Sequence, residues 1–312
     1  MSDQEIDALQ DKVTEVEDEV AKKIVGQRET LRNLLVCMMC DGNALLEGNP
    51  GLAKTMMVRT VADVTDLSFS RIQSTPDLMP SDVTGTEVIR EVEGEKEFVF
   101  ERGPVFANVV LADEINRATP KTQSAFLEAM EERQVTSAGE TYDLPEPFFV
   151  LATQNPIDQE GTYPLPEAQS DRFMMKIVFD YPSFEEEDKI VTRYTRDTED
   201  SIELDTVLTA DELSRLQQHV RDVPIADDLR ERAVRIVEST RESDEIEFGA
   251  SPRASISLVL AAKALSFLRG NAHVTEPSIE RMAVPVMRHR IILDFHAERE
   301  GLTPDEAIEK LV

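Results

Sequence analysis

One short turn near the start of the chain constrains the fold more than any other feature. It follows an apolar stretch at 44–47 that is typical of a buried strand, and it opens a helix at about Ala53. The turn comprises Gly48, Asn49, Pro50, Gly51, Leu52, Ala53, Lys54 and Thr55. The common phosphate-binding loop is Gly, any four residues, then Gly-Lys-Ser/Thr, so Ala53 stands where the second fixed glycine usually lies. The sequence therefore predicts a phosphate-binding loop; the alternative is a plain strand-to-helix turn.

The residue types of this turn suit a nucleotide. Glycines let backbone N–H groups converge on the β-phosphate, and the helix N-terminus adds positive potential. The Lys54 ammonium would reach the β- and γ-phosphates, and the Thr55 hydroxyl would bind Mg²⁺.

A second apolar stretch, at 109–112, ends in the carboxylates Asp113 and Glu114. At a strand end beside the phosphate loop, Asp113 could hold Mg²⁺ through water, and Glu114 could polarise the attacking water as a general base. The chain between Thr55 and Asp113 has room for a helix, a strand and another helix. The simpler interpretation is that two solvated acidic residues merely end a strand.

Short apolar strands and helices alternate through the first half of the chain. Further apolar stretches lie at 148–152 and 174–179, and helical patterns such as 120–132 separate them. This alternation predicts an α/β fold, a parallel sheet with helices on both faces. Upstream, apolar residues at spacings of three and four predict an amphipathic helix over 3–22.

After about residue 181 the pattern changes, and the chain is expected to be helical only. The expected helices cover 184–195, 209–221, 226–241, 253–269, 275–292 and 304–311. We therefore expect an N-terminal helix at 1–22, an α/β nucleotide-binding domain at 23–181 and an all-α domain at 182–312.

The charge balance argues against nucleic acid as a partner. The chain has 62 acidic and 33 basic residues, a formal net charge of −29, and a surface of this sign repels phosphate backbones. Solubility in high salt, as in a halophile, is the simplest explanation, and an acidic functional surface is the alternative. The longest run without charged residues is eleven, and the N-terminus lacks the pattern of a secretion signal, so we expect a cytoplasmic protein without membrane insertion.

Cys37 and Cys40 have the spacing of a metal or redox site but lie in an apolar helical stretch. With two cysteines in the whole chain and no second pair, packing inside a helix is the expected role.

Taken together, the motifs resemble those of AAA+ ATPases, specifically the MoxR family in the clade that includes the magnesium-chelatase motor subunit. Five segments carry the resemblance: 48–55, 111–118, 123–135, 152–156 and 165–173. Alanine at position 53 is the form that this family uses. The resemblance implies an AAA+ α/β domain with a C-terminal all-α lid, and Mg²⁺-dependent hydrolysis of ATP.

The resemblance also implies roles for single residues. Asn155 is similar to sensor 1, a polar residue on the strand between the phosphate loop and the metal-holding strand. Arg172 is similar to the arginine finger, which acts in the neighbouring subunit's site. Arg117 and Arg133 are rival candidates for that finger. The structural alternatives are an amide that caps a strand end for Asn155, and a salt bridge with Asp171 or Glu167 for Arg172.

Arg253, at the start of a helix, is similar to sensor 2, which reaches the γ-phosphate from the lid. An arginine there is poorly placed for the helix dipole, which favours a functional reason for it. Val25 and Gly26, with Gln27, resemble the segment that lies against adenine.

Two insertions typical of the clade are expected at 88–102 and 134–147, projecting toward a central pore; ordinary hairpins are the alternative. The resemblance implies a homo-oligomeric ring, expected to be a hexamer, that acts on a client protein, for which a von Willebrand factor A-domain protein is a candidate. The expected output is chaperone-like remodelling or insertion of a metal cofactor. The alternatives are a metal-chelatase motor subunit, a nucleic-acid translocase or helicase, and a nucleotide-gated binding module with little turnover.

Overall fold

The computed structural model describes residues 3–92, 95–155, 162–196 and 202–312. At its centre lies a five-stranded sheet with the order β2-β5-β8-β1-β9. Neighbouring strands pair in parallel throughout, as expected. The strand bounds are Phe69–Gln73 for β2, Val109–Asp113 for β5, Phe149–Gln154 for β8, Ala44–Glu47 for β1 and Met175–Val178 for β9.

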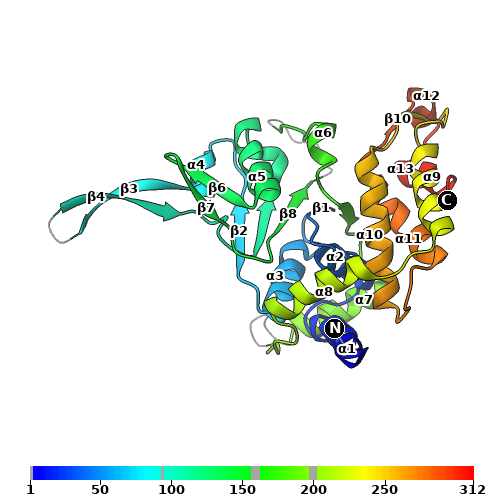
Figure 1. Cartoon of the computed structure of the whole chain (residues 1–312), viewed down its shortest axis with the longest axis horizontal. Helices are drawn as coiled ribbons and strands as arrows, with labels where there is room; N and C mark the ends of the chain where they lie inside the picture. The colour runs from blue at the N-terminus through cyan, green and yellow to red at the C-terminus, as the bar shows by residue number, and fades with distance from the viewer. Residues whose placement is uncertain (1–2, 93–94, 156–161, 197–201) are drawn as a thin grey trace.

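Helices cover both faces of the sheet, which confirms the expected α/β architecture (Figure 1). Alternate side chains of β5 enter two different cores: Val109 and Leu111 join one, and Val110 and Ala112 join the other. The first core includes helices α1 (Asp3–Ala21), α2 (Arg28–Met39) and α3 (Lys54–Val64). The second core includes α4 (Pro80–Thr84) and α5 (Pro120–Glu132).

The C-terminal part is mainly helical and packs against α2 and the β9 edge of the sheet. Its helices are α7 (Phe184–Tyr194), α8 (Ala210–Asp222), α9 (Asp227–Ser239), α10 (Pro252–Leu268), α11 (Glu276–Met287), α12 (Phe295–Arg299) and α13 (Pro304–Glu309). The α8 and α10 helices contact α2, and α11 contacts β9. The pair Cys37 and Cys40 is buried in this region, and burial raises the pKa of both thiols, as suits core packing.

The expectation of helices only was wrong for two short segments of this part. Strands β10 (Ile246–Phe248) and β11 (Ile292–Leu293) pair in an antiparallel ladder, and the helix expected over 275–292 ends at Met287. Strands of two or three residues are too short to produce an alternating pattern, so periodicity does not detect them.

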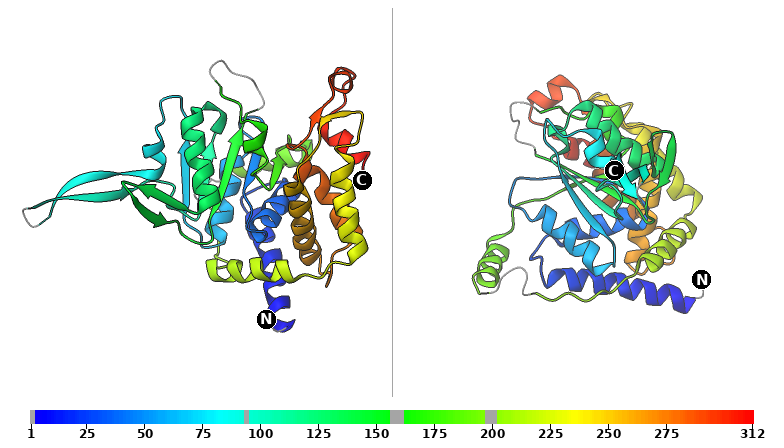
Figure 2. Two further views of the ribbon diagram at one scale, coloured as in Figure 1. Left: turned by 45° about the horizontal axis from the view of Figure 1, so that its top comes forward. Right: turned by 90° about the vertical axis from the view of Figure 1, so that its left-hand side faces the viewer.

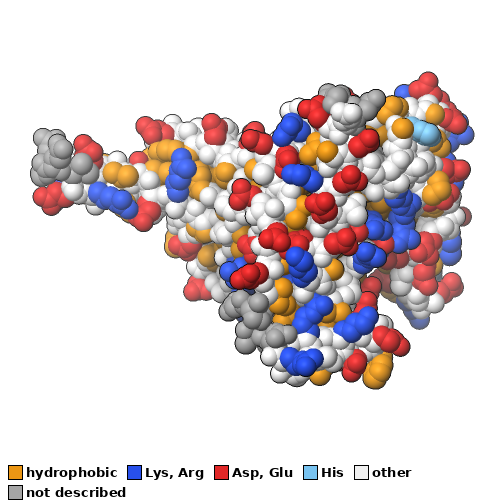
Figure 3. Space-filling model, turned by 90° about the horizontal axis from the view of Figure 1, so that it is seen from below, with side chains coloured by type: hydrophobic (Ala, Val, Ile, Leu, Met, Phe, Trp, Pro, Cys, Tyr) orange, Lys and Arg blue, Asp and Glu red, His pale blue; other side chains and the backbone are white. Residues whose placement is uncertain are grey.

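Both expected insertions contain a β-hairpin. The longer one joins β3 (Gly85–Val92) to β4 (Glu95–Arg102), and the shorter one joins β6 (Gln134–Ser137) to β7 (Glu140–Asp143). The longer hairpin extends far from the body of the molecule (Figures 1 and 2). Its cross-strand pair of Ile89 and Phe98 is exposed, and hydrophobic side chains lie along the hairpin in Figure 3.

Acidic and basic side chains are interspersed on the face seen in Figure 3. Among the described residues, no helix combines the length and the apolar character that a membrane span needs.

Candidate nucleotide-binding site

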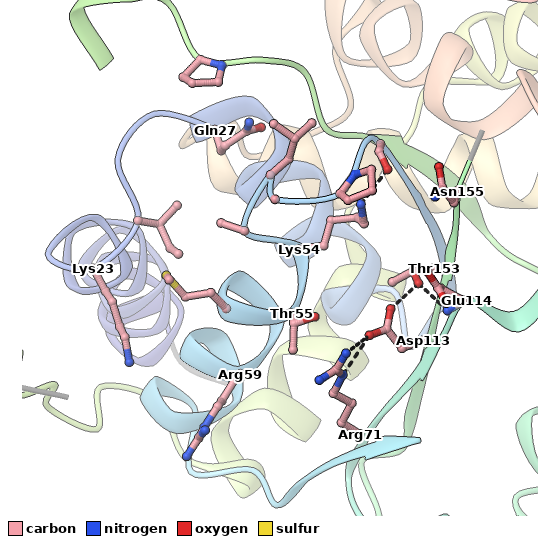
Figure 4. Close-up of a pocket in the computed structure, with 18 of the residues that line it drawn as sticks. Lys23, Gln27, Lys54, Thr55, Arg59, Arg71, Asp113, Glu114, Thr153 and Asn155 are labelled. Atoms are coloured by element: carbon pink, nitrogen blue, oxygen red, sulfur yellow. Dashed lines mark hydrogen bonds and ion pairs between the residues drawn. The ribbon is translucent and has the colours of Figure 1, made fainter. Parts of the chain in front are cut away.

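A cavity of about 730 Å³ lies beside the loop that follows β1 and the carboxyl ends of β5 and β8 (Figure 4). Its size is in the range of ordinary ligand sites. Of the residues predicted to bind or process a nucleotide, it is lined by Val25, Gly48, Pro50, Gly51, Leu52, Ala53, Lys54, Thr55, Asp113, Glu114 and Asn155. Segments that lie far apart in the sequence therefore meet at one end of the parallel sheet, where ligands of such folds bind.

Three residues of the predicted phosphate loop have positive φ. Gly48 has φ +158°, Gly51 has φ +86°, and Ala53, the residue before α3, has φ +60°. Gly48 is needed for space, because an added Cβ would lie 2.8 Å from the Phe179 carbonyl oxygen. Ala53 takes the left-handed conformation that the more common glycine would adopt at lower cost.

The Lys54 ammonium lies inside this turn, where Nζ donates to the carbonyl oxygens of Gly48 (2.6 Å) and Asn49 (2.9 Å). Burial lowers the pKa of Lys54 from its ordinary value, while Asp113 and Glu114 act in the opposite direction. The loop thus holds a positive charge among its own carbonyl groups, and an ammonium group can make the same kind of charge-assisted hydrogen bond to phosphate oxygens.

Asp113, buried at the end of β5, has a partner for each carboxylate oxygen. Oδ2 accepts from Arg71 on β2, through Nε at 2.8 Å and Nη2 at 2.5 Å, and Oδ1 accepts from Thr153 Oγ1 at 2.6 Å. Arg71 and Thr153 were not predicted from the sequence. Arg71 occupies an edge strand with little apolar pattern, whereas Thr153 lies within the recognised 152–156 segment.

Two oxygen-bearing side chains in the cavity are of the kind that binds a magnesium ion. Figure 4 shows Lys54, Thr55 and Asp113 around one space, to which Thr55 contributes a hydroxyl and Asp113 a carboxylate. Mg²⁺ prefers such ligands and is usually held by one or two protein oxygens together with phosphate oxygens. Among the described residues, no cluster of three or more His, Cys, Asp or Glu is placed to hold a metal by itself.

Glu114 is held at the edge of the same space. Its backbone N–H donates to Thr153 Oγ1 (2.7 Å), and its Oε2 accepts from Gln73 Nε2 (3.1 Å) and Arg117 Nη1 (2.9 Å). Asn155 follows β8, which lies between β1 and β5 as expected for sensor 1. Pro156, the last residue of the 152–156 segment, falls outside the described residues.

The opposite wall of the cavity combines the segment before α2 with α7. Val25 and Gln27 line it together with Pro182, Ile190 and Tyr194. The Tyr194 hydroxyl donates to the Lys23 carbonyl oxygen at 2.7 Å, which ties α7 to that segment. The contribution of α7 was missed, because nothing in its sequence distinguishes it from other amphipathic helices.

Two of the predicted binding residues support the cavity without lining it, among the residues that the structure describes. Asn49 Nδ2 donates to the Tyr181 hydroxyl at 3.0 Å. Gly26 has φ +69°, and an added Cβ would lie 2.6 Å from the Glu186 carboxylate.

The predicted arginine finger and sensor 2 are both absent from the described lining of the cavity. The Arg172 guanidinium pairs with Glu131 on α5, and Arg253 Nη2 lies 3.6 Å from the same carboxylate. The alternative that paired Arg172 with Asp171 or Glu167 named the wrong partner.

The rival finger candidates have other partners. Arg117 Nη1 lies 2.9 Å from Oε2 of Glu114 in the same subunit, and Arg133 Nη2 lies 2.6 Å from Oδ2 of Asp41. Arg117 therefore belongs to the site of its own chain.

Comparisons with known proteins agree with this arrangement. The family model described as "ATPase family associated with various cellular activities (AAA)" matches residues 43–175, and an AAA lid domain model matches 238–311. Chaperone MoxR1 of Mycobacterium tuberculosis is 43% identical over 303 residues, covering 94% of this chain and 79% of that protein. Protein YeaC of Bacillus subtilis is 42% identical over 296 residues, covering 95% and 91%.

A solved structure from Cytophaga hutchinsonii, of a protein assigned to the ATPases, is 41% identical and superposes with a TM-score of 0.91 over 99% of this chain and 95% of that one. The similarity extends over the α/β part, the lid and the loop that binds phosphate in AAA proteins. The chain therefore belongs to the MoxR family of AAA+ ATPases.

Proposed function

We propose that the chain is a Mg²⁺-dependent ATPase that works in the cytoplasm as a homo-oligomeric ring, which we take to be a hexamer. One observation carries the proposal: Lys54, Thr55, Asp113 and Glu114 converge on a single cavity at the end of a parallel sheet. Membership of an AAA ATPase family supports it.

ATP would bind with its phosphates in the turn before α3 and its base against Val25 and Gly26. Lys54 Nζ would leave the carbonyl oxygens of Gly48 and Asn49 for the β- and γ-phosphates. Thr55 and Asp113 would hold Mg²⁺. The bound ion would neutralise the charge that develops on the phosphate oxygens.

Hydrolysis would proceed by attack of water on the γ-phosphorus. A bond forms from the water oxygen to phosphorus, the bond to the β-phosphate oxygen breaks, and the water proton passes to the Glu114 carboxylate. Asn155 would orient the water or the γ-phosphate. The contacts of Glu114 with Gln73 and Arg117 support a fixed position for the base.

Arg172 and Arg253 would complete the site of a neighbouring subunit. Both lie together on Glu131 rather than at the cavity of their own chain, which supports action in trans. A guanidinium supplied there would stabilise the charge of the transition state.

The ring would use this cycle to remodel a client protein. The Mycobacterium tuberculosis relative is named a chaperone, and the exposed pair Ile89 and Phe98 on the long hairpin is a candidate contact. A von Willebrand factor A-domain protein, with or without metal insertion, is the client class that we propose. The net charge of −29 argues against a nucleic-acid translocase.

The nucleotide chemistry is tested by two substitutions with opposite expected effects. Lys54→Ala should lose ATP binding and turnover, whereas Glu114→Gln should keep Mg·ATP bound and hydrolyse it slowly. Lys121→Ala, an exposed lysine on α5, is the matched control. ATP binding by isothermal titration and phosphate release give the result, and equal loss of binding in both variants would contradict the separate roles.

Sharing of sites is tested by mixing two inactive variants. Arg172→Ala should bind ATP but turn it over up to about 10³-fold more slowly, and Lys54→Ala should still offer its finger. Mixed rings should regain part of the turnover. If the variants co-assemble and the mixture stays inactive, Arg172 does not act in trans.

The client is identified by a trap. Tagged Glu114→Gln, held with ATP, should retain a protein that Lys54→Ala does not, and mass spectrometry would identify it. If the trap retains nucleic acid and no protein from a lysate that has not been treated with nuclease, the result would favour the translocase.

A further inference from the structure

A buried arginine joins the lid to the segment that carries Arg172. Arg290 follows α11, and only 2% of its side chain is exposed. Its Nε donates to Asp171 Oδ1 at 2.9 Å, and its Nη2 donates to the carbonyl oxygens of Asp171 (3.0 Å) and Phe173 (2.7 Å). Arg172 is thus flanked on both sides by residues that Arg290 holds.

Three further contacts lie around this ion pair, and those to Met174 and Phe173 also join the lid to the segment of Arg172. Arg290 Nη1 donates to the carbonyl oxygens of Met174 (2.9 Å) and Val286 (2.6 Å). The buried imidazole of His289 lies with Nε2 3.0 Å from the Phe173 carbonyl oxygen. Burial lowers the pKa of Arg290 to about 10, so the guanidinium is charged at neutral pH.

The Asp171 carboxylate also contacts the N-terminus of α10, the helix that carries Arg253. Ser251 Oγ donates to both oxygens of Asp171, at 3.0 and 2.9 Å. Ser251 is the N-cap of α10, and its hydroxyl accepts from the backbone N–H of Arg253 at 3.2 Å. One ion pair, between the buried Arg290 and the partly exposed Asp171, therefore contacts the segments of both arginines that we assign to the neighbouring site.

We infer that the Arg290–Asp171 pair positions Arg172. By joining the lid to the α/β domain, the pair fixes the place of Arg172 relative to the neighbouring subunit's site, and it does not contact the nucleotide itself. The inference rests on the proposed action of Arg172 in the neighbouring subunit. A planar guanidinium with its donors engaged allows one geometry, and a lysine cannot reproduce it. A displacement of about 1 Å at a catalytic group can cost about 100-fold in rate, so loosening the pair lowers turnover.

Arg290→Lys tests this with the charge retained. The expected result is unchanged ATP affinity and a turnover number lowered about 10- to 100-fold, less than in Arg172→Ala. Arg288→Lys is the matched control: it lies two residues away and pairs within the lid, Nη2 to Asp305 Oδ2 at 2.7 Å, so it should keep nearly full turnover.

Mixing distinguishes positioning of the finger from general damage. Arg290→Lys has an intact phosphate loop and a misplaced finger, so rings mixed with Lys54→Ala should regain turnover, and rings mixed with Arg172→Ala should not. Asp171→Asn, which keeps the shape but removes the carboxylate, should behave in the same way, and it decides the question if Arg290→Lys does not fold.

Normal turnover in folded Arg290→Lys and Asp171→Asn would overturn the inference, and so would loss of ATP affinity with no rescue by Lys54→Ala. If the mixture of Arg172→Ala and Lys54→Ala still regains turnover, either result leaves the proposed function standing. If that mixture of Arg172→Ala and Lys54→Ala stays inactive, Arg172 does not act in trans.

Discussion

Arg172 and Arg253 meet on one carboxylate. The first precedes β9 and the second opens α10, yet the guanidinium groups of both reach Glu131 on α5. If these arginines act on a phosphate of the neighbouring subunit, each must leave Glu131 to do so. Glu131 would then compete with the nucleotide for both cations.

Glu131→Gln should raise turnover. Both ion pairs are partly exposed and contribute about 1 kcal/mol at most, so the expected increase is no more than about fivefold. Steady-state phosphate release measures it. Glu128→Gln, an exposed glutamate one turn earlier on α5, should leave the rate unchanged. A lower rate in Glu131→Gln would mean that the carboxylate orients the arginines rather than competing for them.

Arg71→Ala should lower the Mg²⁺ concentration needed for half-maximal turnover. Arg71 binds the Asp113 carboxylate through two nitrogens, so it competes with Mg²⁺ for the same oxygen. Half of the Arg71 side chain is exposed, so the pair is worth about 1 kcal/mol and the shift should be about fivefold. Titration of Mg²⁺ at fixed ATP gives the value.

Arg59→Ala is the control for that titration, because Arg59 lines the same cavity on the side of α3 away from Asp113 in Figure 4. A higher Mg²⁺ requirement in Arg71→Ala would show that Arg71 holds Asp113 in its ligand position.

Salt should stabilise the protein. At −29, self-repulsion is strong, and in 1 M salt the screening length falls to about 3 Å. The thermal unfolding midpoint and the assembled fraction should both rise between 50 mM and about 2 M KCl. NaCl should act equally, because screening depends on ionic strength. A flat or falling midpoint would remove the expectation of adaptation to high salt.

His289 should make the protein less stable in mild acid. Burial holds its pKa well below the ordinary value, so below about pH 6.5 the unfolded chain binds a proton that the folded chain does not. This histidine therefore contributes full stability above that pH and loses it as the pH falls, by up to about 1.4 kcal/mol per unit.

His289→Gln, whose amide can still donate to the Phe173 carbonyl, should reduce the difference in unfolding midpoint between pH 7.5 and 5.5. His273→Gln, at an exposed histidine, is the control and should keep the wild-type difference. An undiminished difference in His289→Gln would assign the acid sensitivity to other groups.

Sequence alone determined the elements whose function is local. The turn at 48–55 is predicted to bind phosphate through its own backbone and two adjacent side chains, so contiguous residues suffice to predict it. The carboxylates Asp113 and Glu114 end an apolar strand, and the carboxyl ends of parallel strands lie at one edge of a sheet. The helix over 120–132 was also predicted, because its length lets periodicity emerge.

Only the tertiary structure decided which groups these elements meet. Asp171 and Arg290 are 119 residues apart, and they meet because the lid packs against α2 and β9. The partner of Arg172 was missed because the alternatives Asp171 and Glu167 were chosen for their nearness in the sequence. The actual partner, Glu131, lies on another element, α5. The same holds for α7, whose wall of the cavity depends on where the chain turns after the sheet. Long-range contacts depend on packing between elements, and residue type and spacing within one element carry no record of it.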